Sequence, residues 1–388
     1  MQATMTRLGS KMPFAEAVEE VWLNHWVAVK EGTLRAMTYR HGVIAEALEQ
    51  AEVQQLLVAG PPSEGPAKKL TISADGAMIA LTTGEWREVK SMTIGEIEQV
   101  WNARKGQAEV KTRDISYFSR SYRIRQFEEQ ALAELHRRGL AQAQQIVTVN
   151  DGADWIQSFA DYHFPQAVRV LDFSHAVSYL ANVGQALFGE GTPAFQQWFQ
   201  VIRHQFKHQP PARTLADLGL LRQRQLSDEQ VAVLDQALFY LQKRLLLIDY
   251  PHFQNRGVPI GSGSVESGHK VVVHRRLKQA GMRWAPKHID PLLALRNLIC
   301  NGRWVSGWDQ IVGFHWQQQH LKHRQQARRQ RPSPPPITLD AVSVAPYSET
   351  ADQAASKPAP SKGPYRPAPD HPWRNDKWPT KEAWRWRH

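Results

Sequence analysis

The stretch that decides the fold is KLTISADGAMIAL, residues 69–81. Apolar residues dominate it around an Asp-Gly pair at Asp75 and Gly76, and EWREVKSMTIGEIEQV, residues 85–100, follows. With the turn signals ADG and TTGE, these segments predict three short strands joined by hairpins. Asp75 is expected to lie on the first of these strands.

Downstream of residue 118 the pattern alternates between helices and strands. Residues 119–140 predict an amphipathic helix, and residues 144–164 predict a strand, an Asp-Gly turn and a helix. Residues 166–187 again predict a strand followed by a helix. The resulting order, β-β-β-α-β-α-β-α, indicates an α/β fold with a mixed sheet flanked by helices. In this topology the first and fourth strands are neighbours.

The remaining regions differ in composition. The predicted regions are a helical segment at 1–57, a linker at 58–69, the α/β core at 70–175 and 256–316, an all-helical insertion at 176–255 and a basic Pro-rich tail at 317–388. The tail is expected to be mostly disordered, and its Trp-rich end leaves base stacking and docking on the protein itself as open alternatives. In the first region, a basic second helix with Arg35, Tyr39, Arg40 and His41 fits either a DNA-contacting helix-turn-helix or a plain helical hairpin.

Charge and composition limit the class of protein. The 388 residues carry a formal net charge of +11, which favours a polyanionic partner, nucleic acid before an acidic membrane surface. A single cysteine, Cys300, excludes a disulfide framework. No apolar run approaches the roughly 18 residues that a membrane span needs. A cytoplasmic protein without a membrane partner is therefore expected.

Three carboxylates lie where predicted strands or turns end. Asp75 is on the first strand, Asp151 follows the fourth, and Glu266 begins a helix in IGSGSVESGHK. Each alone is most often a turn or helix-start residue. In the predicted topology, however, they can converge, and converging carboxylates require a cation. Carboxylate oxygens suit Mg²⁺, and two such ions can promote phosphodiester cleavage.

The segment after Glu266 is crowded with cations. On a regular helix, Glu266, Lys270, His274 and Lys278 share one face, next to an apolar stripe. These cations could hold phosphates beside the acid, or they could be an ordinary solvated basic face.

Four motifs, in this order, resemble a known family. They are TISADGAMIALTTGEWREVK, NDGADWI, VLDFSHAVSYL and IGSGSVESGHKVVVHRRLKQAGMRW. Together they resemble the DDE-type transposases of bacterial insertion sequences, in particular the Kra-type group, which is distantly similar to Mutator-like transposases. The resemblance extends over most of residues 10–305. It implies a ribonuclease H-like core with a five-stranded mixed sheet, interrupted by the helical insertion.

The resemblance also implies a catalytic site. Asp75, Asp151 and Glu266 would be the catalytic residues and the ligands of two Mg²⁺ ions, for which Mn²⁺ can substitute. VLDFSHA is similar to a Cys-x-x-His element, with Asp172 in place of the Cys and with His175 at the His position. Asp172 is therefore an alternative to Asp151 as the second ligand, and His175 is either near the site or a structural histidine at a helix start.

The implied function is metal-dependent cleavage at the ends of a mobile element and strand transfer into target DNA. DNA contacts are expected from Lys270, His274, Arg275, Arg276, Lys278, Trp284, Arg35 and Arg40, with core packing as the alternative for Trp284. Such an enzyme would be bacterial and nucleoid-associated and would act as a homodimer or larger assembly on DNA. Two alternatives are a structure-specific ribonuclease H-like nuclease and a truncated, non-catalytic DNA-binding relative.

Overall fold

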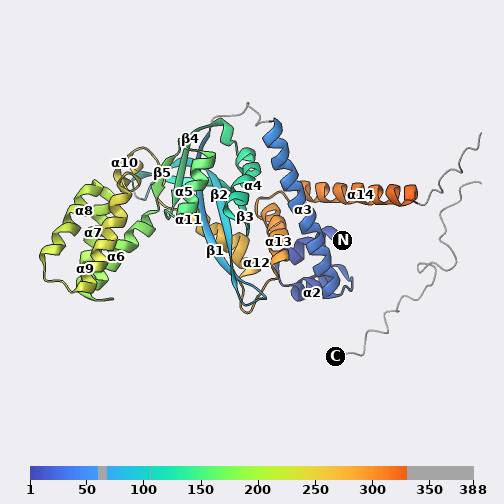
Figure 1. Cartoon of the computed structure of the whole chain (residues 1–388), viewed down its shortest axis with the longest axis horizontal. Coiled ribbons are helices and arrows are strands. Elements are labelled where there is room, and N and C mark those ends of the chain that lie inside the picture. Colours follow the sequence, from blue (N-terminus) through green and yellow to red (C-terminus); the bar gives the residue numbers. More distant parts are fainter. Residues whose placement is uncertain (60–67, 105, 330–388) are drawn as a thin grey trace, which may run out of the picture. The chain divides into compact units, whose positions relative to one another are not determined.

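The computed structural model describes residues 1–59, 68–104 and 106–329, and its centre is one five-stranded mixed sheet (Figure 1). The strands are β1 (Lys68–Ala80), β2 (Trp86–Asn102), β3 (Gln107–Arg120), β4 (Ala143–Asn150) and β5 (Val168–Leu171). They lie in the order β3-β2-β1-β4-β5. The pairs β1–β2 and β2–β3 are antiparallel, and β1–β4 and β4–β5 are parallel. The predicted neighbourhood of the first and fourth strands is thus confirmed.

The predicted turn at ADG is wrong. β1 runs through Asp75 and Gly76, which pair with Ser91 and Lys90 of β2 without a break. A Cβ at Gly76 would lie 2.2 Å from the carboxylate oxygen at the end of the flexible Glu88 side chain, which would have to move aside. The TTGE segment does form the β1–β2 turn, while the third strand is β3, which the sequence analysis left unassigned.

Helices cover both faces of the sheet. On one face, α4 (Ile124–Arg137) and α5 (Asp154–His163) enclose a core that includes Ile72, Phe127 and Phe159. On the other, the elements are α11 (Gly263–Gly268), the π-helical turn η4 (His269–His274), α12 (Arg275–Leu277) and α13 (Ile289–Cys300). Their core includes Ile79 and Val272. Burial on both sides places β1 at the centre of the fold.

The predicted helical insertion is present and begins directly after β5. It comprises α6 (Phe173–Phe188), α7 (Pro193–His208), α8 (Pro211–Leu220), α9 (Asp228–Lys243) and α10 (Tyr250–Asn255). Two short 3-10 turns, η2 (Leu221–Gln223) and η3 (Leu245–Leu247), lie within the insertion, and two more, η1 (Leu140–Gln142) and η5 (Pro286–His288), lie outside it. Leu180, Phe206 and Leu238 form the core of the insertion, which continues into Val149 of β4 and Val170 of β5. The insertion is therefore packed onto the edge of the sheet.

The N-terminal region was expected to be a helix-turn-helix or a helical hairpin, and it contains three helices, of which the last is long. It contains α1 (Gln2–Lys11), α2 (Phe14–His25) and α3 (Glu31–Ala59), and α3 alone has 29 residues. α3 packs closely on α13, and Gly42 leaves the room for this contact. A Cβ at Gly42 would lie 2.5 Å from the carbonyl oxygen of Pro291. His41, grouped by sequence with the basic residues of a DNA-contacting helix, is buried. A helix that uses this face for packing cannot use it to read DNA.

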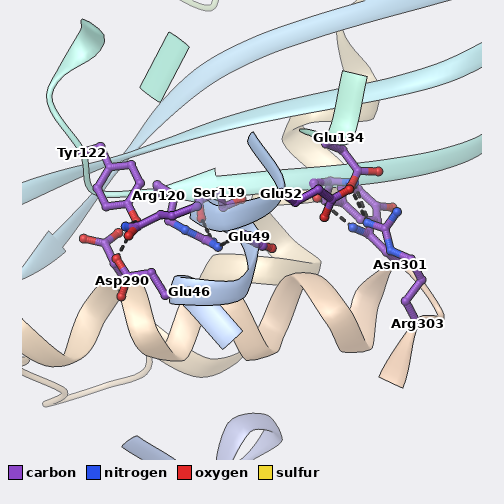
Figure 2. A network of polar contacts seen from close by, with 12 residues as sticks. Glu46, Glu49, Glu52, Ser119, Arg120, Tyr122, Glu134, Asp290, Asn301 and Arg303 are labelled. Atoms are coloured by element: carbon purple, nitrogen blue, oxygen red, sulfur yellow. Dashed lines mark hydrogen bonds and ion pairs between the residues drawn. The ribbon is translucent and has the colours of Figure 1, made fainter. Parts of the chain in front are cut away.

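A polar network joins α3 to the sheet and α13 (Figure 2). Glu49 pairs with the fully buried Arg120 of β3, and Tyr122 donates its hydroxyl hydrogen to Glu46. Asp290 of α13 accepts hydrogen bonds of 2.6 Å from the backbone N–H and the hydroxyl of Ser121. These contacts fix the N-terminal region on the core instead of leaving it as a separate module.

The last described helix, α14 (Trp304–Arg329), corrects the predicted tail boundary. Residues 317–329, the first part of the tail that was predicted to be mostly disordered, are helical. Residues 330–388, including the Trp-rich segment, lie outside the described residues, as does most of the predicted linker. Among the helices that the structure describes, none is both long enough and apolar enough to cross a membrane.

His41 lies buried between α1, α3 and α14. Its Nδ1 is 2.7 Å from the hydroxyl oxygen of Thr6, and its ring meets that of Trp308 edge-on, with 4.9 Å between centroids. Burial, and to a lesser degree His315 and Arg40, lower the pKa of His41 to about 4. The folded protein therefore holds this imidazole neutral.

The free energy of unfolding is expected to fall as the pH drops from about 6.5 towards 4. In this range the unfolded chain protonates His41 and the folded chain does not, so protons favour unfolding. At about 1.4 kcal/mol per pKa unit, the loss from His41 is about 2 kcal/mol between pH 7 and pH 5, and about 3 kcal/mol by the time the pH has passed below 4. Urea denaturation at pH 7 and pH 5 should show a smaller loss for His41→Gln than for the unchanged chain, and equal losses would contradict this account.

Candidate functional site

Asp75 lies on β1, the central strand, on the face that carries α11 and η4. Its Oδ1 accepts a 2.7 Å hydrogen bond from the backbone N–H of Gly76. Its Oδ2 lies 3.5 Å from Nδ1 of His269 in η4. The side chain is 39% exposed, so it can meet a ligand from solvent.

Asp151 follows β4 directly, beside β1. The amide oxygen of Asn150 accepts a 2.7 Å hydrogen bond from the backbone N–H of Ala74, which holds the two strands together next to both acids. Oδ1 of Asp151 accepts a 2.9 Å bond from the N–H of Ala153. Gly152, between them, has a φ of +84°, a conformation that favours glycine. The Asp-Gly turn predicted here is present.

Glu266 is exposed on α11, which lies against the sheet. The hydroxyl oxygens of Ser264 on α11 and Thr93 on β2 are 3.0 Å apart and hydrogen-bonded. Gly268 permits the close approach, because a Cβ there would lie 2.9 Å from Thr93 and 3.1 Å from the ring of Tyr117. These contacts hold α11 against the sheet, and the charge of Glu266 on this helix contributes to the raised pKa of Asp75.

The catalytic role that the sequence analysis expects for Glu266 predicts that Gly268→Ala lowers DNA cleavage roughly ten- to a hundred-fold, because a displacement of about 1 Å at a catalytic group has such an effect. The added methyl group would push α11 away from β2 and β3 and move Glu266 with it. Gly263→Ala, on the same helix, is the matched control, since nothing lies within 4 Å of a Cβ there. Equal cleavage rates for both variants, measured under the same conditions, would contradict this role of Gly268.

The acids interact electrostatically around Asp75. Burial raises the pKa of Asp75, and the negative charges of Asp151, Glu266 and Glu88 raise it further, against the opposing hydrogen bond from Gly76. Within residues 1–59, 68–104 and 106–329, however, no group of three or more His, Cys, Asp or Glu side chains lies close enough together to hold a metal ion. The structure therefore brings the three predicted acids into one electrostatic neighbourhood without a ready-made ligand cluster.

His269 is a site residue that the sequence analysis missed. It is 5% exposed, its Nδ1 faces Asp75, and its buried Nε2 has no hydrogen-bond partner among the described residues. Burial lowers its pKa, so the neutral form is favoured. It belongs to the π-helical turn η4, a feature that often marks functional sites. Its position three residues after Glu266 was the available sequence signal.

Four of the five cations predicted to contact DNA in the segment after Glu266 are accessible. Lys270, Arg275 and Lys278 are exposed and His274 is half-buried, so these four can still meet a phosphate. Arg276 is buried and cannot meet a phosphate, so its predicted contact with DNA is wrong.

Arg276 is 1% exposed, lies over the rings of Phe14 and Trp284, and donates a 2.9 Å bond to the carbonyl of Gly9. Trp284 is buried and donates its indole hydrogen to the carbonyl of Leu277, which supports the packing alternative and removes it from the DNA contacts.

Asp172 is the N-cap of α6. Its Oδ1 accepts a 2.7 Å bond from the N–H of His175, and its Oδ2 accepts a 2.6 Å bond from the N–H of Ser262. The buried carboxylate thus ties the start of the insertion to the segment before α11. Of the two candidates for the second acid, Asp151 is the one that interacts with Asp75.

Three further predicted residues lie apart from Asp75. His175, half-buried on α6, packs near Tyr179 and Tyr240, with ring centroids 5.7 and 5.9 Å away. Arg35 and Arg40 are exposed on α3, and Arg35 pairs with Glu31. The structure therefore does not bring the two α3 cations into direct contact with the acids.

No protein-family model matches the chain, and no curated protein shows significant similarity to it.

Proposed function

We propose that the protein is a DDE-type transposase with a ribonuclease H-like core, which cleaves DNA at the ends of a mobile element and joins them to target DNA. The proposal rests on the electrostatic interaction of Asp75 on β1 with Asp151 at the end of β4 and Glu266 on α11, whose negative charges add to the effect of burial in raising the pKa of Asp75. The strand order β3-β2-β1-β4-β5, with a helical insertion between the second acid and Glu266, supports the same assignment.

The residues fit a divalent cation. Three negative charges raise the pKa of the partly buried Asp75, and a bound cation would relieve that repulsion. The carboxylates of Asp75, Asp151 and Glu266 would hold Mg²⁺ or Mn²⁺, hard ions that prefer oxygen ligands. When bound, such ions supply charge neutralisation at the scissile phosphate and activation of the attacking oxygen.

The chain's own groups have separate tasks in this proposal. His269 is buried, and its Nδ1 lies 3.5 Å from Oδ2 of Asp75, where the imidazole would limit the positions open to that carboxylate. The exposed cations Lys270, Arg275 and Lys278 follow Glu266 and would contact the DNA backbone. Such contacts make DNA binding fall with rising salt concentration. Because two element ends must be joined, the active form on DNA is proposed to be at least a dimer.

A cleavage and joining assay tests the proposal. The substrate is labelled DNA that carries the flanks of the protein's own gene, incubated with Mg²⁺, Mn²⁺ or EDTA. The proposal requires cutting at the flanks with either metal ion, none with EDTA, and joined products. Cutting without joining would favour a structure-specific nuclease, and binding without cutting under any condition would favour a non-catalytic relative.

A further inference from the structure

The helical insertion reaches the loop that carries Asp151 through one aromatic side chain. The hydroxyl of Tyr240, on α9, donates a 2.8 Å hydrogen bond to the backbone carbonyl of Asp151. Tyr179 of α6 stacks on Tyr240, with ring centroids 4.0 Å apart and an angle of 11° between the planes. The guanidinium carbon of Arg244 lies 3.7 Å from the centroid of the same ring. Two groups this close cannot share one face, so the Tyr240 ring lies between Tyr179 and Arg244.

Gly152 shows that this contact is close. Besides its positive φ, a Cβ at Gly152 would lie 3.0 Å from Nε of Arg244 and 3.1 Å from the hydroxyl oxygen of Tyr240. The glycine after Asp151 therefore serves both the turn and the approach of the insertion. The insertion and the acid-bearing loop form one unit.

Arg244 has unused binding capacity. Its guanidinium donates to the carbonyl oxygens of Tyr240, at 3.3 Å, and Gly152, at 3.4 Å. A guanidinium carries five N–H donors, so these two bonds leave several unused. The side chain is half-buried, and it forms no ion pair with any carboxylate in the part of the chain that the structure describes.

An unpaired, oriented guanidinium is suited to an oxyanion, because its planar fork of N–H donors can bond two oxygens of one phosphate. A base cannot stack on Tyr240, because both faces of that ring are covered. Backbone recognition is therefore favoured over base recognition at this position.

We propose that Arg244 binds a backbone phosphate of the DNA strand at the Asp75–Asp151 site, and that Tyr240 positions both Arg244 and the Asp151 loop. This inference rests on the proposed function and adds a phosphate contact from the helical insertion. Arg244 contacts the substrate in this account, whereas Tyr240 acts through the backbone of Asp151.

The test is DNA binding as a function of salt, without divalent metal, on a double-stranded oligonucleotide with the flanks of the gene. Each phosphate contact contributes about 0.9 to the slope of log affinity against log salt concentration. Arg244→Gln should reduce the slope by about one contact, since the amide can keep a hydrogen bond to Gly152 but has no charge. Tyr240→Phe should leave the slope unchanged and lower the cleavage rate. Arg222→Gln is the matched control, because Arg222 belongs to the same insertion and pairs with Asp235.

The outcomes separate this inference from the proposed function. A reduced slope for Arg244→Gln, with an unchanged slope for Arg222→Gln and unchanged melting temperatures, supports the phosphate contact. Equal slopes for the Arg244 variant and the unchanged chain would overturn it even if the protein binds and cuts DNA. A lower melting temperature of Arg244→Gln with an unchanged slope would show that Arg244 stabilises the fold and does not bind a phosphate. If the unchanged protein does not bind DNA, the proposed function and this inference fail together.

Discussion

Replacing Glu266 by Gln, or Asp75 or Asp151 by Asn, should lower DNA cleavage about a thousand-fold, because each change removes a charge worth several kcal/mol at the reacting phosphate. The amides keep the size of the side chains, so the fold and DNA binding should persist. The measurement is the single-turnover cleavage rate with saturating Mg²⁺, next to the DNA affinity of each variant.

Asp154→Asn is the matched control for Asp151→Asn. Asp154 lies three residues further on, in the first turn of α5, and is exposed. Its replacement should leave the rate unchanged. If Asp151→Asn cleaves at the unchanged rate, the assignment of the second acid is wrong.

Arg120→Met should lower the free energy of unfolding by about 3–5 kcal/mol, because it leaves the Glu49 carboxylate buried without its partner. The Arg120 side chain is 1% exposed and that of Glu49 is 15% exposed. Burial already raises the pKa of Glu49, which the charge of Arg120 counteracts. Urea denaturation at neutral pH measures the effect.

The control is Arg113→Met on the same strand, where the Arg113–Glu98 pair is exposed. Exposed ion pairs contribute less than about 1 kcal/mol. The double change Arg120→Met with Glu49→Leu should recover part of the loss, since no charge is then buried alone. Similar losses for Arg120→Met and Arg113→Met would show that the network in Figure 2 does not hold the N-terminal region on the core.

The strand and helix order of the core could be predicted because its signals are local. Apolar runs next to Asp75 and Asp151, followed by amphipathic helices, were enough to make the first and fourth strands neighbours. β3 was missed because it is an edge strand whose sequence, QAEVKTRDISYFSR, alternates charged residues with few apolar ones. It also contains Asp114 with a φ of +49°, close to the irregular pairing of β2 and β3.

The sequence indicated which strands and helix carry the three acids, and it did not indicate the residues around them. Asp151 and Glu266 are close enough to Asp75 to raise its pKa, but the three acids form no ligand cluster among the described residues. Arg276 was expected to contact DNA as one of the cations that follow Glu266, and its aromatic partners Phe14 and Trp284 were not foreseen. Nothing in a single sequence indicates that an arginine is buried between rings that lie far away along the chain.

The central claim is that Asp75, Asp151 and Glu266 share one metal site. Iron-mediated cleavage of the chain tests it most directly: Fe²⁺ replaces Mg²⁺, and ascorbate with peroxide generates radicals that cut the backbone next to the bound ion. The account predicts cuts near residues 75, 151 and 266, suppressed together by excess Mg²⁺ and by Glu266→Gln. Cuts at one of these segments alone, or a cutting pattern unaffected by Glu266→Gln, would contradict it.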